Sequence, residues 1–355
     1  MHIRAYRSSI IIAAAFTALI SLFWLMPEFA FIFFIALLLS LLLSPIADRL
    51  ARHMPRGLAA GLVVAAVVLL ASSLFAVISS TFVPTLTRFV GDFPHIAEEL
   101  HSSPLIDNSP FLNDEIDSLF NEIRAASVGA LTSSLSMIVE LFGRFIDMVI
   151  IIFVTFYFIK DGEEIKSYLA GLFPSRDYAR VLALFNRILD SLTIYIRSQL
   201  IICLISGTIV FLYYTVRGLP YASVFAVLSG ICEFIPVLGP TVASAFGVIL
   251  TATVNVFVAA QTIIFYLILT QTNHNFVYPT LIGHSLNLHP VAIILGIIIG
   301  GELLGAAGMF LAVPVIVTCK LVIGDIYDAQ QQLKQTLQDS RWLTRHENER
   351  NRNNQ

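Results

Sequence analysis

Charged side chains are scarce in this chain: Asp, Glu, Lys and Arg together make up 13% of its 355 residues, while 57% are hydrophobic. A soluble domain usually carries roughly 25% charged residues. A chain with half that share cannot cover itself with polar surface, so lipid must be its solvent. The net charge of −3 offers no basic surface for nucleic acid, and we expect no such partner.

Cysteine and recognisable catalytic motifs are equally scarce. Cys203, Cys232 and Cys319 each lie alone in an apolar stretch without metal or redox spacing, which is typical of small buried hydrophobic residues. The chain has no Walker A sequence, no His-Glu-x-x-His and no Gly-x-Gly-Asp motif. These absences argue against ATP coupling within the chain and against an intramembrane enzyme. We therefore expect no catalytic activity, no cofactor and no metal site.

Long apolar runs are what the chain does contain. A helix that crosses a bilayer needs about 20 mainly apolar residues. Candidate helices occupy 10–26, 29–45, 57–83, 143–159, 198–216 and 256–272, and two longer apolar tracts occupy 220–254 and 290–323. The sequence therefore predicts an all-α polytopic membrane protein with about eight membrane segments, the first of them a retained helix and not a cleaved signal peptide.

The placement of Lys and Arg predicts the orientation of these segments. Basic residues gather before the first helix, after the second and fourth, and in the tail, which places both termini in the cytoplasm. Residues 85–142 are acidic and are expected outside, as amphipathic helices. The expected divisions are three membrane helices in 1–84, outward helices in 85–142, and the fourth helix with a cytoplasmic loop in 143–175. A transport unit follows in 176–323 and begins with an interfacial amphipathic helix at 176–197. The last division is a polar cytoplasmic tail in 324–355, which is expected to be disordered beyond Leu343.

The tract 220–254 is interrupted at its centre by Pro236, Gly239 and Pro240. Each arm of about 15 residues would rise roughly 22 Å, which is shorter than the ~30 Å hydrocarbon core. Short arms joined by a Pro/Gly apex favour a re-entrant helical hairpin. The tract 290–323, with several glycines at its middle, has the same layout. The alternative is that each tract is a single broken crossing, which gives the same cytoplasmic C-terminus.

The two tracts also share a spacing that indicates an internal repeat. In the first, Pro220 is followed by Gly230, Glu233 and Gly239; the corresponding residues of the second are Pro290, Gly300, Glu302 and Gly308. Each tract follows one membrane helix, so the second unit would enter from the opposite side. Such an inverted repeat places a transporter's binding site near the membrane midplane, where the repeats meet.

Glu233 is the strongest candidate for a functional side chain. A carboxylate inside an apolar stretch costs at least ~2.5 kcal/mol, so it must be protonated, paired or facing a water-filled cavity. It could carry a proton or cation, or bind the apex backbone as a structural group. The full set of candidate substrate- or ion-binding residues is Glu233, Pro236, Gly239, Pro240, Thr241, Gln199, Arg197, Gln271, His274, Asn275, Glu302 and Gly301.

Different reasons support the other members of this set. The apex residues would expose backbone groups that can hold a polar ligand. Gln271, His274 and Asn275 belong to a polar cluster, with Asn273, that ends a membrane helix; interfacial capping is the alternative for them. Arg197 opens the fifth membrane helix, where snorkelling is the alternative.

At these residues the sequence resembles the autoinducer-2 exporter family of prokaryotic membrane proteins. The matching motifs lie in order across 150–322: Tyr157 to Glu163, Tyr195 to Gln199, Gly218 to Ala222, Ile235 to Pro240, Gln271 to Asn275 with Pro279, and Leu288 to Pro290. The resemblance implies a homo-oligomer in the cell (inner) membrane that exports a small polar solute or, in some members, exchanges sodium for protons. Ser198 and His274 depart from the family pattern, and the second departure affects any cation site borrowed from that position.

Three functional hypotheses follow. The first is an exporter of a small polar solute that works by alternating access and uses an ion gradient. The second is a sodium–proton antiporter that uses Glu233 and Glu302. The third, of another class, is a channel or oligomeric scaffold that acts through 85–142. The expected partners are a small molecule or ion, the lipid bilayer and further copies of the chain.

Overall fold

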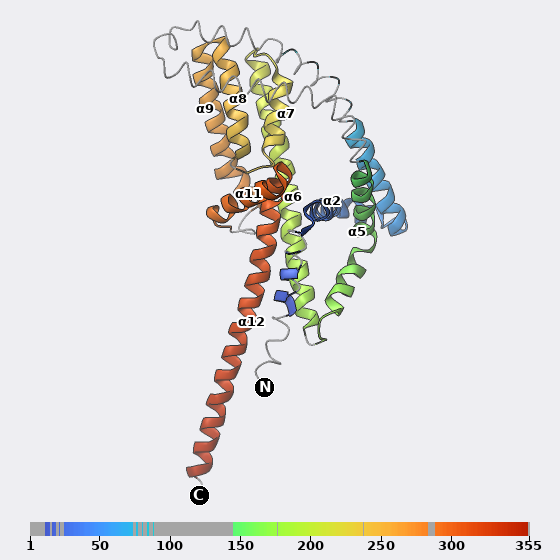
Figure 1. Ribbon diagram of the computed structural model, residues 1–355, viewed down its shortest axis with the longest axis vertical. Coiled ribbons are helices and arrows are strands. Elements are labelled where there is room, and N and C mark those ends of the chain that lie inside the picture. Colours follow the sequence, from blue (N-terminus) through green and yellow to red (C-terminus); the bar gives the residue numbers. More distant parts are fainter. Residues whose placement is uncertain are drawn as a thin grey trace. The chain divides into compact units, whose positions relative to one another are not determined.

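The computed structural model describes residues 25–73, 145–175, 177–236, 238–282 and 288–353, with isolated positions before residue 25 and between 76 and 88. In these ranges the regular elements are all helices, which confirms the predicted all-α class (Figure 1). The predicted first helix, the end of the third and the outward segment 85–142 lie wholly or largely outside the described residues, so the expectations for them stay predictions.

Five of the described helices are long and apolar enough to cross a membrane, which supports a multi-pass protein. They are α2 (Pro27–Leu50), a helix at Arg56–Ser73, the helix α6 (Tyr178–Val216), the stretch Val256–Leu281 and the first half of α12, at Ala306–Gln331. The helix α5 (Phe145–Gly171) covers residues 145–159 of the predicted segment 143–159 and continues into a charged second half. Three more apolar helices are too short to cross alone, so the predicted count of eight stays a prediction.

Two long helices differ from the sequence-based expectation. The predicted interfacial helix at 176–197 and the membrane helix at 198–216 form one helix, α6, of 39 residues. No proline and only one glycine interrupts this stretch, so nothing breaks the backbone hydrogen bonds between its polar and apolar halves. The predicted disorder beyond Leu343 is wrong: α12 (Ala306–Asn353) continues as a helix to Asn353. Its polar end is rich in Gln, Arg and Leu, which are strong helix formers.

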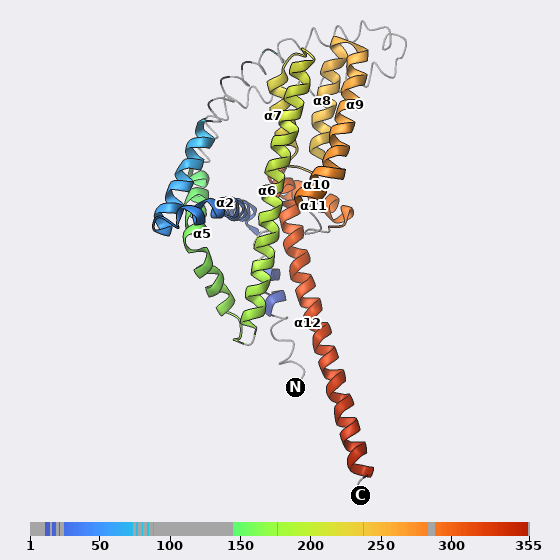
Figure 2. The same cartoon turned by 180° about the vertical axis from the view of Figure 1, so that it is seen from behind.

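The chain forms two compact units that are described separately: one contains 42–156 and 194–286, the other 1–41, 157–193 and 287–355. In the first unit, α7 (Ala222–Cys232) packs on α8 (Leu238–Val254), and α8 packs on α9 (Val256–Thr272), as Figures 1 and 2 show. The core between these helices and the second half of α6 is aromatic, with Tyr214 stacked on Phe225 at a centroid distance of 5.1 Å.

The chain reverses direction between α7 and α8 within five residues, 233–237, so the two helices are antiparallel. Gly239 makes this reversal possible: a Cβ atom at this position would lie 1.6 Å from the carbonyl oxygen of Cys232. The predicted interruption by Pro and Gly is therefore a real helix break with a close backbone contact. Its interpretation as a re-entrant loop in the membrane stays a prediction.

In the second unit, α11 (Pro290–Leu304) packs on the start of α12, and a single residue, Gly305, with a φ of +60°, connects them. The backbones meet at Gly300 and Gly308, where a Cβ on Gly308 would lie 1.9 Å from the Gly300 carbonyl oxygen. Both apolar tracts thus contain two packed helices joined by a short, glycine-dependent turn.

Ion pairs also join helices within the second unit. Asp325 on α12 is buried and accepts hydrogen bonds from the guanidinium groups of Arg180 and Arg187 on α6, at 2.6 and 2.9 Å. Arg180 and Arg187, which the amphipathic pattern places opposite the apolar face of α6, therefore pair with another helix.

Candidate functional site

Glu233 lies at the C-terminal end of α7, immediately before the helix break, and only 4% of its surface is exposed. The sequence places it there because α7 is apolar throughout and ends where Pro236 prevents its continuation. Its backbone N–H still donates to the carbonyl of Ser229, so the last turn of the helix is intact at this residue. The result is a carboxylate carried by a regular helix into the interior of the unit.

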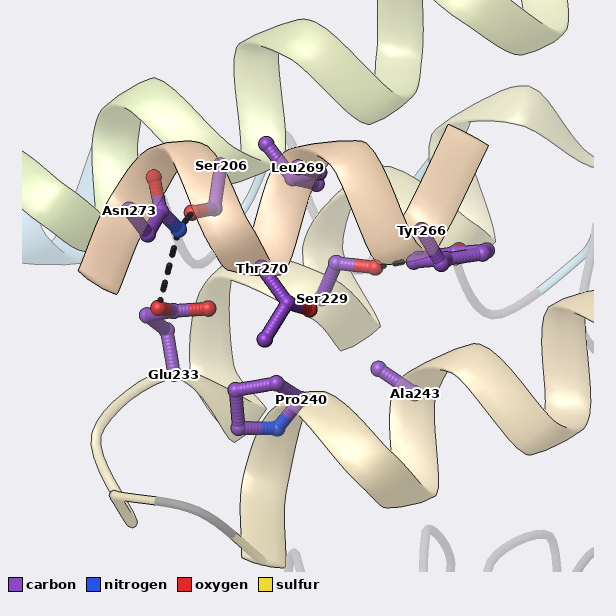
Figure 3. A pocket seen from close by; sticks show the side chains of 9 residues that line it. All are labelled: Ser206, Ser229, Glu233, Pro240, Ala243, Tyr266, Leu269, Thr270 and Asn273. Atoms are coloured by element: carbon purple, nitrogen blue, oxygen red, sulfur yellow. Dashed lines mark hydrogen bonds between the residues drawn. The ribbon is translucent and has the colours of Figure 1, made fainter. Parts of the chain in front are cut away.

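Two neighbouring helices hold Glu233. The side-chain amide nitrogen of Asn273 donates to the Oε1 atom of Glu233 at 3.1 Å and to the hydroxyl of Ser206 at 2.8 Å (Figure 3). The amide nitrogen of Gln199, on α6, donates to the backbone carbonyl of Glu233 at 2.6 Å. The carboxylate and the helix end are therefore fixed by neutral donors, and none of these contacts is an ion pair.

Asn273 lies at the end of the buried face of α9, and a π-helical turn begins at this residue. The element η1 (Asn273–Val277) directly follows α9 and leads into the short helix α10 (Tyr278–Ile282). A π turn has i→i+5 hydrogen bonds, and it is rare and frequent at functional sites. Here the N–H of Tyr278 donates to the carbonyl of Asn273. Asn273 faces the interior while its neighbours on both sides are exposed, because it continues the buried face of α9 that carries Thr262, Tyr266 and Leu269.

A small cavity of about 10 Å³ opens beside the Glu233 carboxylate. It is lined by Ser206, Ser229, Glu233, Pro240, Ala243, Tyr266, Leu269, Thr270 and Asn273 (Figure 3). A volume of about 10–15 Å³ is what a single water molecule needs. The lining is polar on the side of Glu233 and Asn273 and includes a contact of 3.4 Å between the hydroxyl oxygens of Ser229 and Tyr266.

The chemistry that this site offers is that of one carboxylate among neutral oxygen and nitrogen groups. Glu233 carries the sole carboxyl group in the cavity lining. Within the part of the chain that the structure describes, no three His, Cys, Asp or Glu side chains gather in a way that could hold a metal ion. The cavity can take a water molecule, a proton or a small monovalent cation, and is too small for an organic solute in this conformation.

The structure brings together some of the predicted site residues. Glu233 and Pro240 line the cavity, and Gln199 bonds Glu233 from outside it. Gly239 is buried against α7, and Pro236 lies half-buried in the break itself. These residues form the turn that holds Glu233 in place.

Other predicted residues do not line the cavity. Thr241, Gln271, His274 and Asn275 are exposed, and Arg197 is half-buried without lining the cavity. Glu302, exposed, and Gly301 belong to α11 in the other compact unit. Their binding roles stay predictions.

Ser206, Ser229 and Asn273 are site residues that were not among the residues predicted from the sequence. Ser206 and Ser229 are common residues in apolar helices, and nothing in their local sequence distinguishes them. Asn273 was visible as part of the polar cluster that includes Gln271, but it was not distinguished there from its exposed neighbours. The available signal was its spacing of seven residues from Tyr266, which places both on one helix face.

Comparison with known proteins agrees with this architecture. The family model described as "AI-2E family transporter" matches residues 10–328. The chain is 33% identical over 212 residues to "Putative transport protein YrrI" of Bacillus subtilis, a match that covers 60% of each chain. It is 36% identical over 194 residues to "Putative transport protein YueF" of the same organism, covering 54% of this chain and 52% of YueF.

A third relative, "Putative transport protein MT0215" of Mycobacterium tuberculosis, is 29% identical over 267 residues and is matched over 72% of its length. The chain thus spans about half to three fifths of the two Bacillus relatives that it matches. Because the family model covers nearly the whole chain, this multi-pass membrane protein belongs to the AI-2E transporter family.

Proposed function

We propose that the protein is a secondary transporter that exports a small polar solute by alternating access, with Glu233 as the group that couples transport to an ion gradient. The single observation that carries this proposal is the buried carboxylate, held only by neutral groups beside an ion-sized cavity. A neutral side chain would fill a purely structural role at this position at a lower energetic cost, because burying a charge in a membrane protein is costly.

The lengths of the short helices support a position near the middle of the membrane. The 11 residues of α7 rise about 16 Å, roughly half of the ~30 Å hydrocarbon core. If α7 and α8 enter from one face as a re-entrant hairpin, Glu233 at their apex lies near the midplane. That is where the sites of transporters with inverted repeats are found.

The size of the cavity supports alternating access. A volume of about 10 Å³ admits an ion or a water molecule but no solute with several heavy atoms. A solute would therefore need a second conformation with a wider space next to Glu233. Autoinducer-2 is the solute that the family name suggests, and we propose it as the exported compound.

Glu233→Gln provides the test. This variant keeps the shape of the side chain and its ability to accept a hydrogen bond from Asn273 but removes the ionisable group. We expect the purified variant to assemble normally and to lose gradient-driven transport in proteoliposomes with an imposed pH or sodium gradient and a panel of small polar solutes. Glu164→Gln, which removes an exposed carboxylate on α5, is the matched control and should transport like the wild type. Full gradient-dependent transport by Glu233→Gln would overturn the coupling role.

The ion-sized cavity also favours a second candidate, sodium–proton antiport without an organic solute. A pH-sensitive dye inside the proteoliposomes separates the two: an antiporter moves protons when sodium alone is added outside. A solute exporter does so only when its solute is present.

A further inference from the structure

Two buried oxygen atoms on α6 have no hydrogen-bond partner within the described part of the protein. They are the hydroxyl of Tyr195 and the Oε1 atom of Gln199. Both side chains are almost completely buried, at 2% and 0% exposure. Buried polar atoms in proteins are nearly always bonded, either to protein or to an ordered water molecule. Two such atoms four residues apart on one helix therefore indicate a bound polar group.

The two side chains share one face of the helix, because they are four residues apart. The amide nitrogen of Gln199 is already used by the Glu233 carbonyl, at 2.6 Å. The remainder of the Gln199 side chain lies beside the thiol of Cys203 and the hydroxyl of Tyr278. Tyr195 also has Tyr278 and Cys203 as its neighbours. Tyr278 is thus a neighbour of both Tyr195 and Gln199, which indicates a shared polar position on the α10 side of Glu233.

This position is separate from the cavity, because none of the three residues lines it. The π turn explains how Tyr278 reaches it: residues five apart come to the same side of such a turn, so Tyr278 follows Asn273 inward. Glu233 therefore has polar surroundings on two sides, one next to its carboxylate and one next to its backbone.

The chemistry of the three side chains defines the ligand. The Oε1 atom of Gln199 only accepts, whereas the two tyrosine hydroxyls can donate or accept. None of the three is charged, so the position offers no counter-charge to an ion. A water molecule has the required donors and acceptors, and two to four polar partners are what a buried water usually has.

We propose that Tyr195, Gln199 and Tyr278 bind a buried water molecule on the α10 side of Glu233. Together with the water-sized cavity, this position places a hydrated site on each side of Glu233. The functional role of these two sites rests on the proposed ion coupling: an ion or proton bound at Glu233 then has a polar group next to it on two sides.

Radiolytic hydroxyl labelling of the full-length protein in lipid nanodiscs tests the proposal with water itself as the probe. A short X-ray pulse generates hydroxyl radicals from bound water, so a buried side chain next to an ordered water is oxidised and a dry one is not. We expect label on Tyr195 and Tyr278. Phe225, which is 1% exposed, stacks on Tyr214 in the aromatic core and does not line the cavity, is the dry control and should remain unlabelled. If Tyr195 carries no more label than Phe225, the proposal is overturned.

Tyr195→Phe gives a second, independent readout. If the hydroxyl binds water, its removal lowers the unfolding temperature and reduces the label on Tyr278. If the hydroxyl is dry and unpartnered, its removal raises the unfolding temperature, and that result contradicts the proposal. Tyr213→Phe, which removes a formed hydrogen bond to Thr262, sets the scale of a lost contact. Neither readout involves transport, so a failure of the proposed function would leave them unaffected.

Discussion

The side chain of Asn273 connects the two other polar groups closest to it, Ser206 and Glu233, through one nitrogen atom. Because the amide donates to the carboxylate, Glu233 is held as an acceptor. In Figure 3 the amide oxygen of Asn273 points away from Glu233, and this oxygen has no partner among the described residues. Asn273 is thus the residue whose loss should affect Glu233 most directly.

Asn273→Ala is expected to destabilise the protein by about 1.5–3 kcal/mol, because a buried carboxylate loses its side-chain donor. The measurement is chemical or thermal unfolding of the purified protein in a defined detergent or nanodisc. Asn275→Ala is the matched control: this residue is exposed two positions further on and bonds only Gln271 at 3.3 Å among the contacts that the structure describes. Equal effects of the two substitutions would contradict the role assigned to Asn273.

At the scale of elements, the turn between α7 and α8 determines where Glu233 lies. Two antiparallel helices joined by five residues must approach closely at their ends, and Gly239 provides the space. A similar contact between Gly300 and Gly308 joins α11 to α12. In each pair the glycine has no Cβ atom, so the two backbones can come into direct contact.

Gly239→Ala should therefore destabilise the protein by about 3 kcal/mol, the upper end of the range for overpacking, because its Cβ would overlap the Cys232 carbonyl. Gly162→Ala in α5 is the control, since a Cβ there meets nothing within 4 Å. We expect the control to be neutral or to gain up to about 1 kcal/mol from better helix propensity. Unfolding measurements on both variants check the prediction, and a stable Gly239→Ala protein would contradict the close turn.

At the scale of the whole molecule, the arrangement of the α7–α8 pair in the membrane determines whether the proposed site lies at the midplane. The two helices pack on each other, and the five residues 217–221 connect the end of α6 to the start of α7. In a re-entrant hairpin, the end of α6 and the end of α8 lie on the same side of the membrane. In a broken crossing they lie on opposite sides.

Single cysteines at Val216 and Val254, both exposed positions at these helix ends, distinguish the two topologies. The hairpin predicts that a membrane-impermeant thiol reagent labels both from outside and that a cysteine at Leu238, at the apex, is protected. The native cysteines are replaced first, and labelling is measured in intact cells and in inverted vesicles. Labelling of position 254 from the cytoplasmic side alone would exclude the hairpin and with it the inverted repeat.

Much of the fold was predictable because the bilayer imposes simple rules on composition. The apolar runs predicted the helical class and most of the helix positions, and Pro236 with its neighbours predicted the break after α7. The joined helix α6 and the helical end of α12 were not predicted, since sequence polarity changes along a helix without ending it. Among the site residues, Glu233 was identifiable because a carboxylate in an apolar stretch is costly wherever it packs.

The sequence by itself determined that lipid surrounds the protein, where most helices lie, and that Glu233 is a carboxylate in an apolar stretch. Each of these conclusions depends on local composition. Only the tertiary structure decided which side chains meet Glu233. Ser206 and Gln199 come from α6, and Asn273 comes from the end of the buried face of α9. Such contacts depend on the rotation of each helix about its axis and on close backbone approach. A shift of one residue in a helical turn moves a side chain to another face and removes the contact.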